Sequence, residues 1–401
     1  MTLKNKTVLL GVTGSIAAYK IANLARMLVK LGCNVHVLMT KNAVNFINPI
    51  TFETLTGNKC LIDTFDRNFQ YSVEHVALAK VADVVLIAPA SANVIGKIAC
   101  GIADDMLTTT VMACPCKKII SPAMNHNMFH NPIVQDNIEK LRHYGYTIIE
   151  PDSGMLANGD LGDGRMPEEK VLLEYILREI ACEKDLCGKK VLVTAGATAE
   201  AIDPVRFITN HSSGKMGCAV ATAAMLRGAD VTLVAGNMQV EPPMFVKTTR
   251  VVSAKEMFEA VKAESDNADI IIKAAAVADY TPKTTATEKL KKSDNELCIE
   301  LERTTDILGY LGQNKKANQV LCGFSMETEN MLENSKAKLI KKNLDIIAAN
   351  NVKVEGAGFC GDTNVLTLIT KDDIIPLEKM SKDDASQLLL DEIIKINTTK
   401  Q

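Results

Sequence analysis

The sequence predicts an α/β protein with two doubly wound domains, each built on a parallel sheet that helices cover on both faces. Apolar runs typical of buried strands alternate with helix-like runs. The same order of elements begins twice, at residues 7 and 190. The length of 401 residues also exceeds what one hydrophobic core usually serves.

The first half opens on a continuous apolar run at residues 7–12, which is typical of a strand buried on both faces. Residues 13–15 form a turn, a helix-like run extends to residue 31, and a second strand follows at 34–39. Residues 82–90 supply a further buried strand. This order predicts the strand–helix–strand units of a parallel sheet.

The second half repeats the pattern. It predicts a strand at 190–196, a helix at about 215–227 and a strand at 230–235, and residues 268–276 correspond to 82–90. Two Rossmann-like domains follow, and their ligands are expected in the loops after the strands.

We place the domain boundary within residues 180–188, because this segment follows a helix rich in Glu and Leu and precedes the new strand. The predicted domains are therefore residues 1–187 and 188–401.

The composition excludes several classes of protein. Hydrophobic residues make up 47% and charged residues 23%, as in ordinary globular proteins. The 45 Lys and Arg against 48 Asp and Glu give a formal net charge of -3, which offers no basic field for nucleic acid or anionic lipid. We find neither a secretion signal nor an apolar run of the ~20 residues that a bilayer needs, so a cytoplasmic protein is expected.

The 11 cysteines are odd in number and scattered, and most lie in apolar runs, so they are interpreted as reduced core thiols. Only Cys114 and Cys116 are closely spaced. A metal site there is one interpretation, and a turn before a buried strand is the favoured one, because no second pair at zinc-site spacing accompanies them.

Polar groups follow the strands of the first half. Gly11, Gly14 and Ser15 supply a tight turn and a hydroxyl at a helix N-terminus, which suits a phosphate, although a simple Ser-capped turn has the same pattern. The turn lacks the full Gly-x-Gly-x-x-Gly pattern, so a dinucleotide site is not favoured. Residues 88–105 and 121–128 are further polar loops, and the Gly-rich segment 154–166 is long enough to act as a flap.

In the second half, residues 195–198 form a nucleotide-binding turn, but no acidic residue ends the strand at 231–237, so a dehydrogenase is not favoured. The loop 203–217 carries Arg, Asn, Ser and Gly just before a helix, which predicts a binding site for a phosphorylated small molecule. Asp279 follows a strand end of small residues, and 283–292 is expected to be a solvated mobile loop.

These motifs, from about residue 6 to residue 349, resemble the flavin-dependent cysteine decarboxylases and, more specifically, the bacterial bifunctional phosphopantothenoylcysteine decarboxylase and phosphopantothenate–cysteine ligase family. The resemblance implies an FMN-binding flavoprotein fold in the first half and a nucleotide-binding ligase fold in the second. It implies FMN contacts at Gly14, Ser15, Thr40, Ser91, Asn93, Asp104, Asp105 and Met106.

The resemblance further implies that His75 and Asn125 face the substrate and that Arg165 and Met166, in the flap, bind it. His75 is then the base for the substrate thiol, and Asn125 holds the carboxylate and amide. A lone His before an apolar helix is otherwise more often structural.

One residue departs from the family. The flap normally carries a Cys that protonates the enethiol during the final reduction, and Asn158 occupies that position. An amide forms hydrogen bonds but does not act as a general acid, so this departure bears on the re-reduction step.

In the ligase half, the resemblance implies that Arg206, Asn210 and Ser212 bind phosphopantothenate, with Asn210 and Lys289 catalytic. It assigns CTP to Ala275, Asp279, Lys289, Thr305, Asp306, Ile307, Leu308, Phe324, Lys338 and Lys342. Lys338 and Lys342 are four residues apart, so on a helix they share one face; a solvated basic stripe has the same spacing. Mg²⁺ is expected mainly on the nucleotide phosphates, with unknown protein ligands.

The sequence therefore predicts a bifunctional enzyme of coenzyme A synthesis, with CTP-dependent ligation through an acyl-CMP followed by FMN-dependent decarboxylation. Two alternatives stay open: an active ligase whose decarboxylase releases the oxidised enethiol because of Asn158, and a flavin-binding regulatory protein without turnover. The expected partners are small molecules, and the resemblance implies trimers of flavin domains that pair through ligase domains into a dodecamer.

Overall fold

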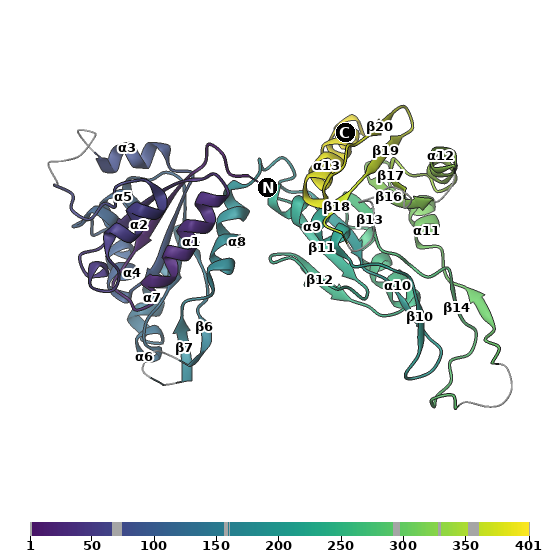
Figure 1. Ribbon diagram of the computed structural model, residues 1–401, viewed down its shortest axis with the longest axis horizontal. Coiled ribbons are helices and arrows are strands. Elements are labelled where there is room, and N and C mark those ends of the chain that lie inside the picture. Colours follow the sequence, from purple (N-terminus) through teal and green to yellow (C-terminus); the bar gives the residue numbers. More distant parts are fainter. Residues whose placement is uncertain are drawn as a thin grey trace. The chain divides into compact units, whose positions relative to one another are not determined.

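The computed structural model describes residues 2–65, 74–155, 159, 161–291, 297–327, 330–351 and 361–400. The chain divides into two compact units, Met1–Cys182 and Glu183–Gln401 (Figure 1). The boundary placed after residue 187 from the sequence lies a few residues later, just before the first strand of the second unit.

The first unit holds a parallel five-stranded sheet in the order β2-β1-β3-β4-β5. Its strands are β1 (Thr7–Val12), β2 (Asn34–Met39), β3 (Val84–Ala90), β4 (Lys117–Pro122) and β5 (Thr147–Ile148). The chain moves outward from β1 in both directions, so β1 and β3 flank the switch point of a doubly wound sheet. The predicted strands at 7–12 and 34–39 are confirmed, and the fold is the predicted α/β class.

Helices cover both faces of this sheet. They are α1 (Ala18–Lys30), α2 (Pro49–Thr56), α3 (Glu74–Val81), α4 (Ala92–Ala99), α5 (Met106–Ala113), α6 (His126–Phe129), α7 (Pro132–His143) and α8 (Glu169–Ile180), with a short 3-10 turn at Ala43–Asn45. One face packs against apolar side chains of α3, α4, α5 and α7, including Leu78, Ile95 and Leu107. The other face carries α1, which also packs against α2 and α8.

The Gly-rich segment contains two strands that the sequence did not predict. β6 (Asp152–Met155) and β7 (Leu161–Arg165) pair antiparallel as a hairpin. The strands of this hairpin could not be recognised in the sequence, because Gly has a low strand propensity and its presence leaves no alternation of apolar and polar residues.

The second unit holds an eight-stranded sheet in the order β12-β11-β8-β13-β16-β17-β19-β20. The strands are β8 (Lys190–Ala195), β11 (Asp230–Ala235), β12 (Lys247–Arg250), β13 (Ile270–Lys273), β16 (Val320–Glu327), β17 (Ile346–Asn351), β19 (Leu366–Thr370) and β20 (Ile374–Pro376). The strands from β12 to β17 are parallel, as predicted.

The expectation of purely parallel sheets is wrong at one edge, where β17, β19 and β20 pair antiparallel. Thr370 N–H donates to Asp373 O at 2.9 Å and closes a tight turn between β19 and β20. A connection this short cannot carry the chain back for a parallel pairing.

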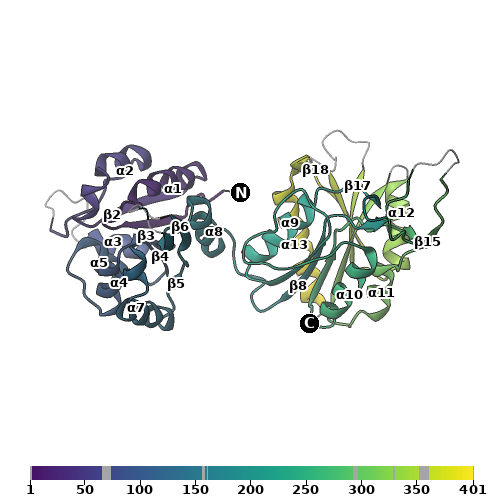
Figure 2. The same cartoon turned by 90° about the horizontal axis from the view of Figure 1, so that it is seen from below.

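Helices also cover both faces of the second sheet: α9 (Lys215–Leu226), α10 (Ala254–Ser265), α11 (Ile307–Asn314), α12 (Met331–Lys341) and α13 (Lys382–Lys400). Figure 2 shows α9 and α13 on one face, with α10 and α11 on the other. Small antiparallel ribbons complete the unit: β9 (Ala199–Ala201) with β10 (Phe207–Thr209), β14 (Tyr280–Pro282) with β15 (Leu301–Arg303), and β18 (Thr363–Asn364) with β21 (Met380–Ser381).

The start of α9 lies directly against the end of β8. A Cβ added to Gly217 would stand 2.5 Å from the Cβ of Ala195, so only glycine permits this approach. This contact brings the loop before α9 to the carboxyl end of the sheet.

Among the described cysteines, Cys33, Cys60, Cys114, Cys218 and Cys322 are buried, as expected for core thiols. Cys116 and Cys182 are partly buried, and Cys100, Cys187 and Cys298 are exposed, so the core-thiol prediction is wrong for these three; Cys100, for example, follows the last turn of α4. Within the part of the chain that the structure describes, no helix is long and apolar enough to cross a membrane.

Candidate functional site

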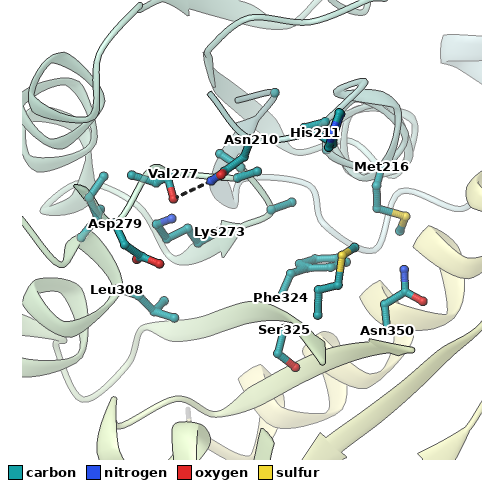
Figure 3. A pocket seen from close by; sticks show the side chains of 18 of the residues that line it. Asn210, His211, Met216, Lys273, Val277, Asp279, Leu308, Phe324, Ser325 and Asn350 are labelled. Carbon is teal, nitrogen blue, oxygen red and sulfur yellow. Dashed lines mark hydrogen bonds between the residues drawn. The ribbon is translucent and has the colours of Figure 1, made fainter. Parts of the chain in front are cut away.

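A cavity of about 1010 Å³ opens at the carboxyl ends of β8, β13 and β16 in the second unit. Loops after these strands and the N-terminal ends of α9 and α11 line it (Figure 3). The predicted residues that line it are Asn210, Ser212, Ala275, Asp279, Thr305, Asp306, Ile307, Leu308, Phe324, Lys338 and Lys342. The cavity thus lies where ligands bind in doubly wound sheets.

Positive side chains dominate the charged part of the wall. They are Lys215, Lys273, Arg303, Lys338, Lys342 and Lys382, against the carboxylates of Asp279 and Asp306. A near-neutral chain therefore concentrates cations in one cavity, which suits a polyanionic ligand.

Lys273 is the main residue that the sequence analysis missed. It ends β13 and is partly buried, beside Asp279 and the loop that carries Val277 (Figure 3). Burial and repulsion by Lys338 lower its pKa to about 8, although Asp279 acts in the opposite direction. The available signal was a lysine at the end of an otherwise apolar strand.

Two of the predicted lysines come from the end of α12. Lys338 lies in its last turn and Lys342 is its C-cap, so both face the cavity as their spacing indicated. Lys342 forms an ion pair with Asp306, and burial lowers the pKa of Lys342. Asp306 also caps α11, since Gly309 N–H donates to its Oδ1 at 2.9 Å.

Hydrogen bonds hold the loop after β13 in place. Asn210 Nδ2 donates to Val277 O at 3.1 Å (Figure 3). Thr194 Oγ1 accepts from Ala275 N–H at 3.1 Å, and Thr198 Oγ1 accepts from Ala278 N–H at 3.0 Å. These three hydrogen bonds fix the position of the loop in the cavity wall.

Arg206 and Lys289 do not line this cavity, in contrast to the other predicted ligase residues. Arg206 forms a two-pronged pair with Asp203, through Nε at 2.9 Å and Nη2 at 2.5 Å, and Nη2 also donates to Leu290 O at 2.8 Å. The guanidinium holds the pKa of Asp203 well below its usual range. Arg206 thus fastens the segment that carries the exposed Lys289.

In the first unit, the predicted residues lie at the carboxyl ends of the strands. Thr13 Oγ1 donates to Pro89 O at 2.6 Å and accepts from Ser91 N–H at 2.9 Å, which ties the loop after β1 to the loop after β3. Gly14 lies against Asn42, so close that an added Cβ would stand 2.8 Å from the Asn42 Cβ.

The other predicted flavin residues follow nearby strands. Ser15 lies in the loop before α1, and Asn93 lies in the first turn of α4. Thr40 follows β2, and its N–H donates to Val12 O at 3.0 Å. The loops after β1, β2 and β3 thus meet at one edge of the sheet.

The acidic residues predicted for FMN have structural partners. Lys97 Nζ lies 2.7 Å from Asp104 Oδ1, and this contact lowers the pKa of Asp104. Asp105 caps α5, with its Oδ1 accepting from Thr108 N–H at 2.8 Å, and Met106 is buried in the core. These carboxylates therefore order the edge of the site.

The loop after β4 carries two features of interest. Ser121 is fully buried and its Oγ has no hydrogen-bond partner among the residues that the structure describes, which leaves a polar atom at the end of β4 ready for a ligand. Asn125 caps α6, and its Oδ1 accepts from Asn127 N–H at 2.9 Å. Its amide NH₂ is thus the group that can donate to a substrate.

The remaining decarboxylase predictions are placed as follows. His75 lies in the first turn of α3 and is partly buried. Arg165 ends β7 and is exposed, whereas Met166 is buried and its carbonyl accepts from Lys20 Nζ at 3.3 Å. Asn158 lies outside the described residues.

The Cys114–Cys116 pair lies between α5 and β4, the turn that the sequence favoured. A hydrogen bond from Cys114 lowers the pKa of Cys116 to about 7. Two thiols alone do not make the tetrahedral set of a structural zinc site.

The chain matches two family models. Residues 1–181 match the model described as Flavoprotein, and residues 186–396 match the DNA/pantothenate metabolism flavoprotein C-terminal domain. The chain is 46% identical over 401 residues to the coenzyme A biosynthesis bifunctional protein CoaBC of Bacillus subtilis (strain 168), covering 98% of each chain. It is 41% identical over 399 residues to the protein of that name from Escherichia coli (strain K12), again covering 98% of each.

One solved structure is the C-terminal domain of a coenzyme A biosynthesis bifunctional protein CoaBC. The chain is 42% identical to it, with a TM-score of 0.46, and the match covers 53% of this chain and 98% of that one.

Proposed function

The chain belongs to the family of coenzyme A biosynthesis bifunctional proteins, and on this premise we propose that it catalyses two successive reactions. The second unit joins phosphopantothenate to cysteine with CTP, and the first unit decarboxylates the product to phosphopantetheine with FMN. The observation that carries the ligase assignment is the cation-lined cavity of about 1010 Å³ at the switch point of the second sheet.

The proposed ligation has two steps. The carboxylate of phosphopantothenate attacks the α-phosphorus of CTP, which forms the acyl-CMP anhydride and releases pyrophosphate. The amine of cysteine then attacks the acyl carbon, so that the amide forms, CMP leaves and the amine loses a proton. Each step moves negative charge among phosphates, which fixed cations stabilise.

The lysines of the cavity divide this task in our proposal. Lys273, Lys338 and Lys342 hold the triphosphate, with Mg²⁺ as its counter-ion, and Asp279 lies beside them to orient the nucleotide. Asn210, which is fixed on Val277 O, positions the acyl group.

Lys289 is proposed to reach the site when its segment closes. Arg206 supports this closure because it joins Asp203 to Leu290 O, next to Lys289. Leu290 N–H also donates to Asp203 Oδ2 at 3.1 Å and Ala286 N–H to Ile202 O at 3.0 Å, so the backbone is anchored and the exposed side chain of Lys289 is the part that moves toward the site in this proposal. Arg206 is then a positioning residue as much as a contact for phosphopantothenate.

A partial reaction tests the acyl-CMP step. With phosphopantothenate, Mg²⁺ and CTP but no cysteine, we expect labelled pyrophosphate to exchange into CTP. Exchange that is independent of phosphopantothenate, or that needs cysteine, would contradict the mechanism.

The first unit fits a flavin. Three features lie at strand ends: the buried Ser121 Oγ, which has no partner in the described part of the chain, the linked loops at Thr13 and Ser91, and the turn at Gly14. Ser15 and its turn would hold the FMN phosphate, and Ser91, Asn93 and the Asp104–Met106 segment would surround the ring. When bound, FMN supplies the two-electron oxidation that makes loss of carbon dioxide possible and later returns the electrons.

The chain's own residues supply the remaining chemistry. His75 accepts the proton of the substrate thiol, and the NH₂ of Asn125 donates to the substrate carboxylate. Arg165 and Met166 lie at the base of the hairpin, where they would cover bound substrate. The predicted trimer and dodecamer remain part of this proposal, and the mass of the protein in solution tests them.

The final proton is the open chemical question, since Asn158 replaces the expected Cys. We propose that water or a neighbouring donor supplies it and that the cycle completes. Mass analysis of the product decides: accumulation of the oxidised enethiol, two hydrogens lighter than phosphopantetheine, would overturn this step and favour the impaired-decarboxylase alternative.

A further inference from the structure

A compact cluster of metal-ligating side chains lies in the first unit, where α6 meets β7. We propose that His126, His130 and Asp163 bind a first-row transition-metal ion of the zinc type. One ligand atom from each residue lies within 4.8 Å of the other two. The ion would fasten the β6–β7 hairpin to the loop that carries Asn125.

The two histidines have the spacing of a chelate. They are four residues apart across the single turn of α6, so they share one face, and their ring centroids are 4.4 Å apart. Asp163 comes from β7, and its Oδ2 lies 2.9 Å from His130 Nε2. Zinc bonds of about 2.0–2.2 Å to nitrogen and oxygen place the ligand atoms slightly farther apart than this pair, so a small opening admits the ion.

The ligands are already oriented. The backbone N–H of Asp163 donates to His126 Nδ1 at 3.1 Å, which fixes the orientation of the ring, and a metal ion bound at Nδ1 would replace this hydrogen bond. Ser153 Oγ donates to Asp163 Oδ1, which directs the second oxygen toward His130. Partners of this kind fix ligand geometry in metal sites.

The backbone on both sides of the cluster is also pinned. Met124 N–H donates to Gly164 O at 3.0 Å. A Cβ added to Gly162 would stand 2.8 Å from His126 Cγ and Nδ1, so only glycine lets β7 approach the ring this closely. The cluster is therefore held in place by contacts other than the hydrogen bond between His130 and Asp163.

The donor set selects the class of ion. Two imidazoles and one carboxylate suit zinc, cobalt, nickel or copper, whereas Mg²⁺ and Ca²⁺ prefer oxygen ligands. His130 is exposed and the other two residues are partly buried, so the ion can enter from solvent. Three protein ligands leave a position for water.

The test is a titration of the full-length, FMN-loaded protein, freed of metals by a chelator, with Zn²⁺ in excess Mg²⁺. We expect the wild type to bind one equivalent of Zn²⁺ with micromolar or better affinity. The affinity should fall at least about tenfold in H130Q, and binding should be lost in H126Q/H130Q. H143Q, at the end of α7, is the matched control and should bind as the wild type does. Cysteines also bind zinc, so C116S serves as a second control. It should still bind this equivalent of Zn²⁺ if the histidine cluster is the site.

A structural readout accompanies the titration. Zn²⁺ should slow amide hydrogen exchange in residues 152–155 and 161–165 of the wild type and not of H126Q/H130Q. A wild type that binds no Zn²⁺, or a double variant that binds it as tightly, would overturn the site and leave an ordinary hydrogen bond between His130 and Asp163. Normal melting of the variants excludes misfolding as the cause.

Discussion

The two units use the same doubly wound topology for sites of opposite character. The second unit lines its cavity with cations such as Lys273 and Lys338. In the first unit, Lys97 is paired with Asp104, and the predicted contacts at Ser15, Ser91 and Asn125 are neutral and partly buried. A triphosphate needs fixed charge, whereas a flavin ring and a thiol substrate need amides, hydroxyls and one base. The fold thus fixes where ligands bind, and the loop side chains decide which ones.

The strongest way to break this comparison is to disable one unit alone. Lys289→Gln should reduce cysteine-dependent amide formation by about 10²- to 10³-fold, because the transition state loses one charge-stabilising donor. Decarboxylation of supplied phosphopantothenoylcysteine should continue at the wild-type rate. Both rates are measured by product mass.

Lys291→Gln is the matched control for that substitution, since it removes an exposed lysine two residues away. Wild-type ligation in Lys289→Gln, or an equal loss in Lys291→Gln, would end the assignment of Lys289.

The next effect concerns the first unit. Asn158→Cys restores, at this position of the flap, the thiol that acts as a general acid in the family. We expect a several-fold rise in the rate of phosphopantetheine formation, with ligation unchanged. Mass analysis of the thiol products checks this, and an unaltered rate would mean that Asn158 does not limit the cycle.

A smaller effect should sharpen the charge argument. Lys338→Gln removes one cation from the wall of the cavity. If this lysine contacts the triphosphate as proposed, the lost charge-assisted hydrogen bond of ~1.5 kcal/mol corresponds to about tenfold in KM for CTP. Lys341→Gln, on the exposed side of the same helix, should leave KM unchanged. Initial rates at varied CTP distinguish the two, and equal effects would favour a general basic stripe.

The smallest effect is a pH dependence. Burial lowers the pKa of Lys273 to about 8, so the residue is an ammonium below that pH and an amine above it. KM for CTP should therefore rise several-fold as the pH passes upward through about 8. Lys273→Arg keeps its charge and should lose this inflection. An identical pH profile in both proteins would exclude Lys273 from nucleotide binding.

The same titration also affects stability. The folded-state pKa of Lys273 lies below its ordinary value of 10.5, so the unfolded chain binds more protons between these two pH values. This residue therefore makes the free energy of unfolding rise with pH above about 8, and denaturant titrations of wild type and Lys273→Arg should reveal the difference.

Much of the fold could be predicted from the sequence because each buried parallel strand is a short, continuous run of apolar residues. The strands at 7–12, 34–39 and 230–235 have the predicted bounds. The β6–β7 hairpin and the antiparallel edge could not be predicted in this way, since Gly-rich strands lack a pattern and pairing direction depends on turn geometry.

The sites show a similar division. Asp279 and the α12 lysines could be placed in the cavity because the family resemblance assigned them to the nucleotide, and the four-residue spacing put the two lysines on one helix face. Lys273 was missed because one lysine at the end of an apolar strand has no pattern of its own. The partners of Arg206 could not be predicted either, because Leu290 O is distant in sequence.

The most direct test of the two-reaction account is one incubation of the wild-type protein with phosphopantothenate, cysteine, CTP and Mg²⁺, followed by identification and quantification of all products by mass. We predict phosphopantetheine, carbon dioxide, CMP and pyrophosphate in equal amounts. Formation of CMP and phosphopantothenoylcysteine without loss of carbon dioxide would contradict the role of the first unit, and absence of CMP would contradict that of the second.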